Sequence, residues 1–177
     1  EAVRRARENG HLCFIDTGRT WRLVRGIFDG QAEFDGYLLG CGTMILYQGE
    51  VLAHSSFSPG LSQRILGALE RYRIDAILEG PREVFRKYAE KYRRLNFPDY
   101  TGAEGEYDKL FARGDTAADM ERFREEFREE LEFIDRGKGF YEILPKGCSK
   151  AAAIRFIAEH LGIPMENTAA IGDGNND

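Results

Sequence analysis

The run IGDGNND at residues 171–177 crowds two carboxylates and two amides into five positions, directly after a short apolar stretch. Asp173 and Asp177 would supply hard oxygen ligands of the kind that Mg²⁺ prefers. Asn176 adds a polar side chain beside them, and the glycines at positions 172 and 174 let the backbone approach a ligand closely. This stretch therefore predicts a metal site.

Two other interpretations fit the same residues. The pattern Asp-x-Asn-x-Asp at 173–177 matches the first five positions of an EF-hand calcium loop. Such a loop follows a long amphipathic helix, whereas here the lead-in NTAAI comes after Gly162 and Pro164, which end the preceding helix. A purely structural Asx-turn is the second alternative.

Two further stretches suit an anion such as phosphate. Thr17, Gly18 and Arg19 follow the apolar run HLCFID and place a hydroxyl, an unhindered backbone and a guanidinium in a row. Lys150 falls in the first turn of a helix predicted to start after Ser149, where the helix dipole disfavours a cation unless an anion binds there too. A threonine-capped turn and a solvated surface lysine are the corresponding alternatives.

Hydrophobic periodicity predicts the helices and strands that must position these stretches. A hairpin turn is expected at Gln48-Gly49, between two strands within 36–55. Helices are expected at 1–9, 19–28, 58–72, 81–92, 120–127 and 149–161, and further strands at 11–16, 74–80, 108–114, 130–137, 140–145 and 167–173.

The order of these elements predicts an α/β protein with an insertion. The two ends follow an α/β pattern, whereas the middle mixes hairpins and helices, so we expect a core of residues 1–43 and 145–177 with an α+β domain at 44–144 between its two parts. Ligands of open α/β sheets gather at the carboxyl ends of the strands, so the three polar stretches should lie together there.

Composition narrows the class of protein. The 177 residues carry a net charge of −5, which gives no drive toward nucleic acid or an anionic membrane, and no apolar run is long enough to span a bilayer. The cysteines at 13, 41 and 148 show no metal-binding spacing, which favours a reducing cytoplasm. The acidic, hydroxyl and cationic stretches together form a set suited to phosphate and Mg²⁺, as phosphoryl transfer requires.

Three segments, FIDTGR, EILPKGCSKAAAI and IGDGNND, occur in this order and resemble the haloacid dehalogenase (HAD) superfamily, in particular its Cof-type phosphatases. The resemblance implies a Rossmann-like parallel-sheet core with an inserted α+β cap of the C2B type. It also implies Mg²⁺-dependent hydrolysis of small phosphate monoesters, such as sugar phosphates, through an aspartyl-phosphate intermediate. The cap would close over the site and select the substrate.

The resemblance also implies roles for particular residues. Thr17 would hydrogen-bond the transferring phosphoryl group, with Gly18 and Arg19 beside it. Lys150 would neutralise the nucleophile and the phosphate. Asp173 would help to hold Mg²⁺, and the pair Asn176 and Asp177 would orient the water shell of the metal and the phosphate pocket.

The sequence departs from the family pattern at three places. Cys41 stands where the family often has asparagine, and Ala151 stands where glycine usually follows the motif lysine. No Asp-x-Asp-Gly-Thr pentapeptide, which carries the nucleophile in the family, occurs in the 177 residues. We therefore expect the core to continue beyond both ends and the 177-residue chain itself to be inactive. The alternative is a non-catalytic phospholigand-binding or regulatory protein on the same scaffold.

Overall fold

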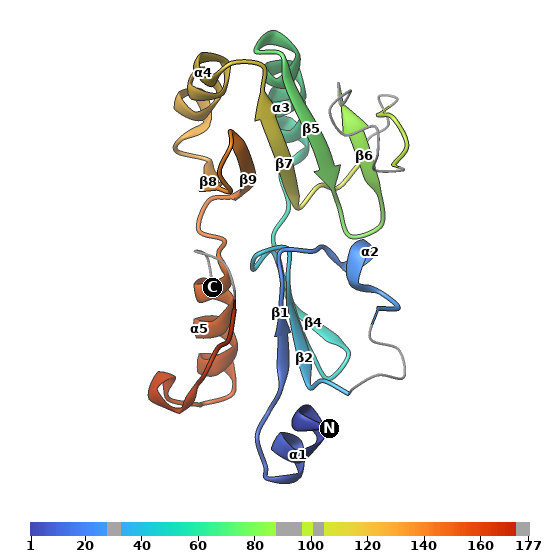
Figure 1. Cartoon of the computed structure of the whole chain (residues 1–177), viewed down its shortest axis with the longest axis vertical. Coiled ribbons are helices and arrows are strands. Elements are labelled where there is room, and N and C mark those ends of the chain that lie inside the picture. Colours follow the sequence, from blue (N-terminus) through green and yellow to red (C-terminus); the bar gives the residue numbers. More distant parts are fainter. Residues whose placement is uncertain (28–32, 88–96, 101–104, 173–177) are drawn as a thin grey trace. The chain divides into compact units, whose positions relative to one another are not determined.

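The computed structural model describes residues 1–27, 33–87, 97–100 and 105–172 (Figure 1). None of the helices within these ranges is long and apolar enough to cross a membrane. The helices are α1 (Ala2–Glu8), α2 (Trp21–Val24), α3 (Pro59–Arg71), α4 (Ala117–Phe127), α5 (Lys150–His160) and a short 3-10 helix (Met165–Asn167). The strands are β1 (Phe14–Asp16), β2 (Gly36–Leu39), β3 (Met44–Tyr47), β4 (Glu50–His54), β5 (Ile74–Glu79), β6 (Val84–Lys87), β7 (Lys109–Gly114), β8 (Leu131–Asp135) and β9 (Phe140–Pro145).

The chain divides into two compact units, the first formed by residues 1–55 and 148–177 and the second by residues 56–147. The sequence placed the first boundary at residue 44, and the structure moves it to residue 56. The reason is that the hairpin of β3 and β4 pairs with β2, so its hydrogen bonds belong to the first sheet. The second boundary shifts from 145 to 148.

The first unit is built on a mixed sheet in the order β1-β2-β3-β4. Strands β1 and β2 are parallel, and the other neighbours are antiparallel. Because side chains alternate between faces along a strand, Leu38 and Ile45 pack against Ala153 and Ile157 of α5 on one face. The other face holds a small cluster built from α2, β2 and β3. The fold class predicted from the sequence is confirmed as α/β, with one parallel pair in the described part of this sheet.

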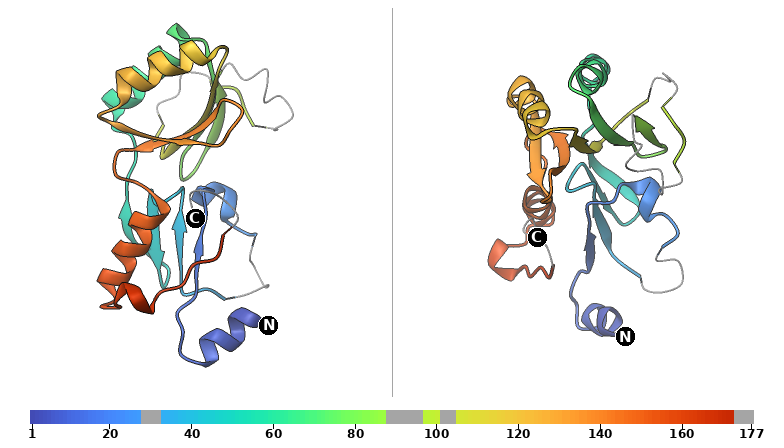
Figure 2. Two further views of the ribbon diagram at one scale, coloured as in Figure 1. Left: turned by 60° about the vertical axis from the view of Figure 1, so that its left-hand side comes forward. Right: turned by 45° about the horizontal axis from the view of Figure 1, so that its top comes forward.

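In the described residues, the second unit holds a five-stranded antiparallel sheet in the order β6-β5-β7-β9-β8. Helices α3 and α4 lie side by side over one face of this sheet (Figure 2). Phe123 and Phe127 of α4 are fully buried there, with ring centroids 4.8 Å apart, and Ile65 and Leu69 of α3 join the same core. The unit therefore has a hydrophobic core of its own.

Two of the expected elements are wrong. A helix was expected from Pro81, but Val84–Lys87 forms β6 and pairs with β5, because cross-strand pairing outweighs a helical spacing of apolar residues. The rest of that expected helix, residues 88–92, lies outside the described residues. A buried strand was expected at 167–173, but residues 168–172 join neither described sheet and are exposed, and residue 173 lies outside the described residues.

The remaining expected helices and strands are confirmed. In them, the capping and turn residues and the spacing of apolar residues favour the same element that the surrounding structure requires. Ser58 caps α3 by accepting a hydrogen bond from the Leu61 amide at 3.3 Å. Gln48 and Gly49 turn the β3–β4 hairpin with φ angles of +49° and +84°, as a tight hairpin turn requires.

The Phe123→Ala variant tests the core of the second unit. We expect it to lower the free energy of unfolding of this unit by about 3–5 kcal/mol, because it removes a fully buried ring and leaves a cavity. Phe156→Ala on α5 is the matched control, because that ring is 39% exposed, and it should cost about 1 kcal/mol or less. Denaturant titration followed by circular dichroism measures both, and equal losses would contradict the assigned core.

Tyr107 provides a pH test of the same core. The side chain is buried, and burial raises its pKa to about 12, with smaller contributions from Tyr100 and Glu83. A raised pKa favours the protonated phenol in the folded state, so this stabilisation is complete below pH 10.0, the ordinary value, and is lost as the pH rises through about 12. Ultraviolet titration of the phenolates should show one component near pH 12 that disappears in Tyr107→Phe. Its persistence in that variant would contradict the assignment.

Candidate active site

The first predicted stretch follows β1 directly. The Thr17 amide donates to the Leu38 carbonyl at 2.9 Å, which extends the pairing of β1 with β2 by one residue. The Thr17 hydroxyl oxygen accepts from the Arg19 amide at 3.2 Å, so threonine does shape the local turn. Such a contact leaves the hydroxyl proton available for another acceptor, so the turn and an anion-binding role are compatible. Gly18 is half-buried and Arg19 is exposed.

A second loop, residues 40–43, follows β2 and holds the first one in place. The Gly40 amide donates to the Arg19 carbonyl at 2.9 Å, and the Cys41 amide donates to the Thr17 carbonyl at 3.1 Å. The two loops meet because β1 and β2 are parallel, so that both strands end at the same edge of the sheet. From the sequence, Cys41 was noted only as a departure from the family. The alternation Gly-Cys-Gly directly after a strand was the available sign of a tight, functional turn.

The third element of the site is the N-terminus of α5. The Ser149 hydroxyl oxygen accepts from the Ala152 amide at 3.0 Å, which confirms Ser149 as the N-cap. Lys150 is the first residue of the helix and is half-buried. Gly42 lies against the Ser149 carbonyl, so the loop at 40–43 touches the start of this helix. The structure therefore brings the Thr17 stretch and the Lys150 stretch to one region of the first unit.

The predicted metal ligands cannot be placed in the same way. Asp173, Asn176 and Asp177 lie outside the described residues, so their roles stay predictions. Within the described ranges, no group of three or more histidine, cysteine, aspartate or glutamate side chains is arranged to hold a metal.

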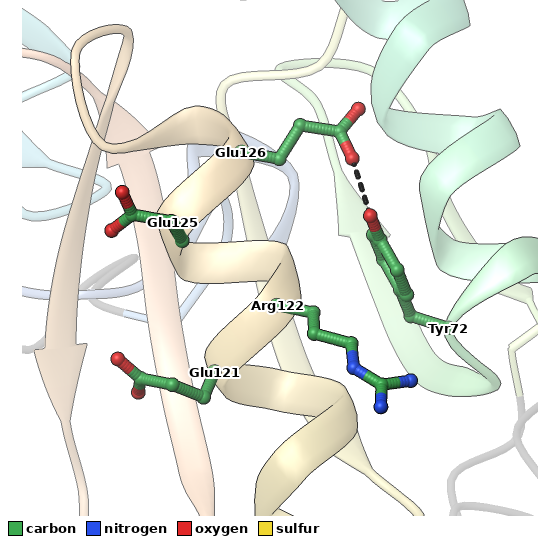
Figure 3. A pocket seen from close by; sticks show the side chains of 5 residues that line it. All are labelled: Tyr72, Glu121, Arg122, Glu125 and Glu126. Carbon is green, nitrogen blue, oxygen red and sulfur yellow. Dashed lines mark hydrogen bonds between the residues drawn. The ribbon is translucent and has the colours of Figure 1, made fainter.

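A pocket of about 530 Å³ lies on the second unit (Figure 3). It is lined by Tyr72, Glu121, Arg122, Glu125 and Glu126. The Tyr72 hydroxyl donates to Glu126 at 2.8 Å, and this hydrogen bond holds the pKa of Tyr72 above its ordinary value. Three carboxylates against one guanidinium repel a phosphate, so this pocket does not suit a phosphate ester.

The whole chain, residues 1–177, matches the family model of the haloacid dehalogenase-like hydrolases. The chain therefore belongs to this family, and the resemblance seen in its sequence motifs is confirmed.

Solved structures of this superfamily share the fold. The sugar phosphatase BT4131 of HAD subclass IIB superimposes with a TM-score of 0.84 at 19% identity, over 99% of this chain and 72% of that one. BT1666 from Bacteroides thetaiotaomicron gives a TM-score of 0.84 at 19% identity, over 99% and 69%. At this level of identity the likeness establishes the fold.

Curated relatives match over shorter segments. The HMP-PP phosphatase of Cronobacter sakazakii is 50% identical over 36 residues, which is 20% of this chain and 13% of that protein. Phosphatase YwpJ of Bacillus subtilis is 37% identical over 54 residues, which is 30% of this chain and 19% of that protein. The matched segments thus span less than a fifth of these relatives.

The N-cap of α5 provides a test of this part of the site. Ser149→Ala should destabilise the first unit by about 1 kcal/mol, because the Ala152 amide loses its acceptor. Ser149→Asn is the matched control, since asparagine caps a helix about as well as serine does. Hydrogen exchange of the amides in the first turn of α5 measures the effect, and equal exchange in the two variants would contradict the cap.

Proposed function

We propose that the protein containing this chain is a Mg²⁺-dependent phosphatase that hydrolyses small phosphate monoesters, sugar phosphates among them, through an aspartyl-phosphate intermediate. The observation that carries this proposal is the meeting of the Thr17 loop and the N-terminus of α5 at the loop 40–43. Hydroxyl, backbone amides, a helix N-terminus and a lysine at one place suit a phosphoryl group. Family membership and the names of the relatives, which are phosphatases, agree with it.

Each residue has a definite task in this proposal. The Thr17 hydroxyl donates to a phosphoryl oxygen, and Gly18 leaves room for that oxygen next to the backbone. Arg19 and Lys150 offset the negative charge of the phosphate, which is the main requirement of phosphoryl transfer. The proposal assigns the nucleophilic aspartate to no residue of 1–177, since no Asp-x-Asp-Gly-Thr occurs among them.

The stretch 173–177 completes the site in the proposal. Asp173 and Asp177 have the oxygen donors that Mg²⁺ prefers, and Asn176 stands beside them to orient the phosphate. When bound, Mg²⁺ would neutralise phosphate charge and polarise the phosphorus. The first unit would be the catalytic core, and the second would be the cap that selects the substrate.

The same proposal covers the binding partner of the protein and its location in the cell. The substrate would be a small phosphorylated metabolite, because nothing in the charge of the chain favours nucleic acid or a membrane surface. The cysteines at 13, 41 and 148 have no metal-binding spacing, and the location in this proposal is a reducing cytoplasm.

The test is an assay of the full-length protein on a panel of phosphate monoesters, with and without Mg²⁺. Asp173→Ala and Lys150→Ala should each lower kcat by about 100-fold or more, because each removes charge that stabilises the transition state. Lys146→Ala is the matched control, since this exposed lysine pairs with Glu132 at 3.3 Å, and its activity should be normal.

The outcomes separate the alternatives. Turnover that survives replacement of Asp173 and Lys150 together would overturn the assignment of the site. Binding of inorganic phosphate without turnover of any ester would instead indicate a non-catalytic phospholigand-binding protein.

A further inference from the structure

The loop of residues 40–43 touches both of the stretches assigned to the phosphate. On one side it donates the two hydrogen bonds described above, from Gly40 to Arg19 and from Cys41 to Thr17. On the other side, Gly42 lies against the carbonyl of Ser149. Residues far apart in the sequence, at 17 and 150, are therefore linked through this one loop.

The contact at Gly42 leaves no room for a side chain. An added Cβ would lie 2.4 Å from the Ser149 carbonyl oxygen and 3.3 Å from the Ala153 Cβ, and real Cβ atoms essentially never approach another atom within 3.0 Å. The same carbonyl accepts the Ala153 amide at 3.0 Å, which is the first hydrogen bond of α5. Gly42 thus sits directly against the group that begins the helix, one residue before Lys150.

The loop also has a strained backbone conformation. Gly40, Cys41 and Gly42 have φ angles of +58°, +58° and +93°, and the left-handed state of Cys41 costs about 1–2 kcal/mol. A strained conformation persists only where its surroundings enforce it. Here the Cys41 side chain is fully buried, and the Gly42 amide donates to the Leu39 carbonyl at 2.9 Å.

We propose that the loop 40–43 is a positioning element that sets the distance between the Thr17 loop and the first turn of α5, with Gly42 as the positioning residue. The loop acts through its backbone. The Cys41 amide donates to the Thr17 carbonyl, and Gly42 lies against the Ser149 carbonyl. The expected effect on kinetics rests on the proposed function. The contacts that link the two stretches through the loop belong to the fold and do not depend on that function. The inference gives a role to the segment around Cys41, the residue that stands where the family often has asparagine.

The decisive variant is Gly42→Ala, with Gly49→Ala as its matched control. Gly49 has a similar φ of +84°, but an added Cβ would meet nothing within 4 Å, so the control carries the conformational strain without the clash. In the full-length protein, Gly42→Ala should raise both KM and the inhibition constant of inorganic phosphate by about ten-fold, since a small misplacement of catalytic groups has large kinetic effects. Neither constant depends on the fraction of enzyme that is folded, so a general loss of stability would leave both unchanged. Unchanged constants in Gly42→Ala would overturn the inference.

A second measurement needs no activity. In an NMR spectrum, Gly42→Ala should shift the amide signals of residues 17–19 and of 150–153 together, whereas Gly49→Ala should shift neither set. If the full-length protein hydrolyses no ester but these paired shifts occur, the proposed function fails and the positioning role stands. Shifts confined to one of the two stretches would overturn the positioning role.

Hydrogen exchange in the wild-type protein covers the case in which Gly42→Ala does not fold. The amides of Gly40 and Cys41 should be protected, and they should become exchangeable in the same opening event as those of Ala152 and Ala153. Independent opening of the two pairs would contradict the inference.

Discussion

The parallel pairing of β1 with β2 is the constraint on which the site depends. Parallel strands end at the same edge of a sheet, so the loops that follow them at residues 17 and 40 must be neighbours. The packing of α5 on the sheet then sets where the helix starts. Its Ala153 and Ile157 are buried against Leu38 of β2 and Ile45 of β3. The start of α5 is thereby brought to the same edge, although more than a hundred residues separate it from β1 in the chain.

The second unit follows a different physical plan. Its described strands pair antiparallel, and α3 and α4 cover one face, so its core forms from local and neighbouring segments. The opposite sheet face carries charge: the buried ammonium of Lys109 lies 3.2 Å from Glu142 and 3.6 Å from Glu79. A buried ammonium needs such partners, because desolvation without them would be costly. This unit therefore combines an apolar layer beneath its helices with an ionic cluster on its other side.

Local signals in the sequence predicted those elements whose stability is decided within a few residues. Ser149 was expected to cap α5 and does so, and the Gln48-Gly49 hairpin forms for the same kind of reason. The predictions failed where pairing with distant segments decides. Val84–Lys87 has a helical spacing of apolar residues yet joins β5, and the run at 168–172 joins neither described sheet and is exposed. The expected boundary at residue 44 also differs from that of the compact units at residue 56, because β3 and β4 pair into the sheet of β2.

By itself, the sequence determined which chemical groups are present and in which order, and this was enough to indicate the HAD family and to single out Thr17, Lys150 and Asp173. It could not determine that Gly42 faces Ser149, or that the Cys41 amide reaches the Thr17 carbonyl. Those contacts join segments whose separation in space is decided by the strand register and by the packing of α5 on the sheet. Only the tertiary structure contains these distances. The positioning role proposed for the loop around Cys41 rests on them, whereas the sequence showed only that Cys41 departs from the family pattern.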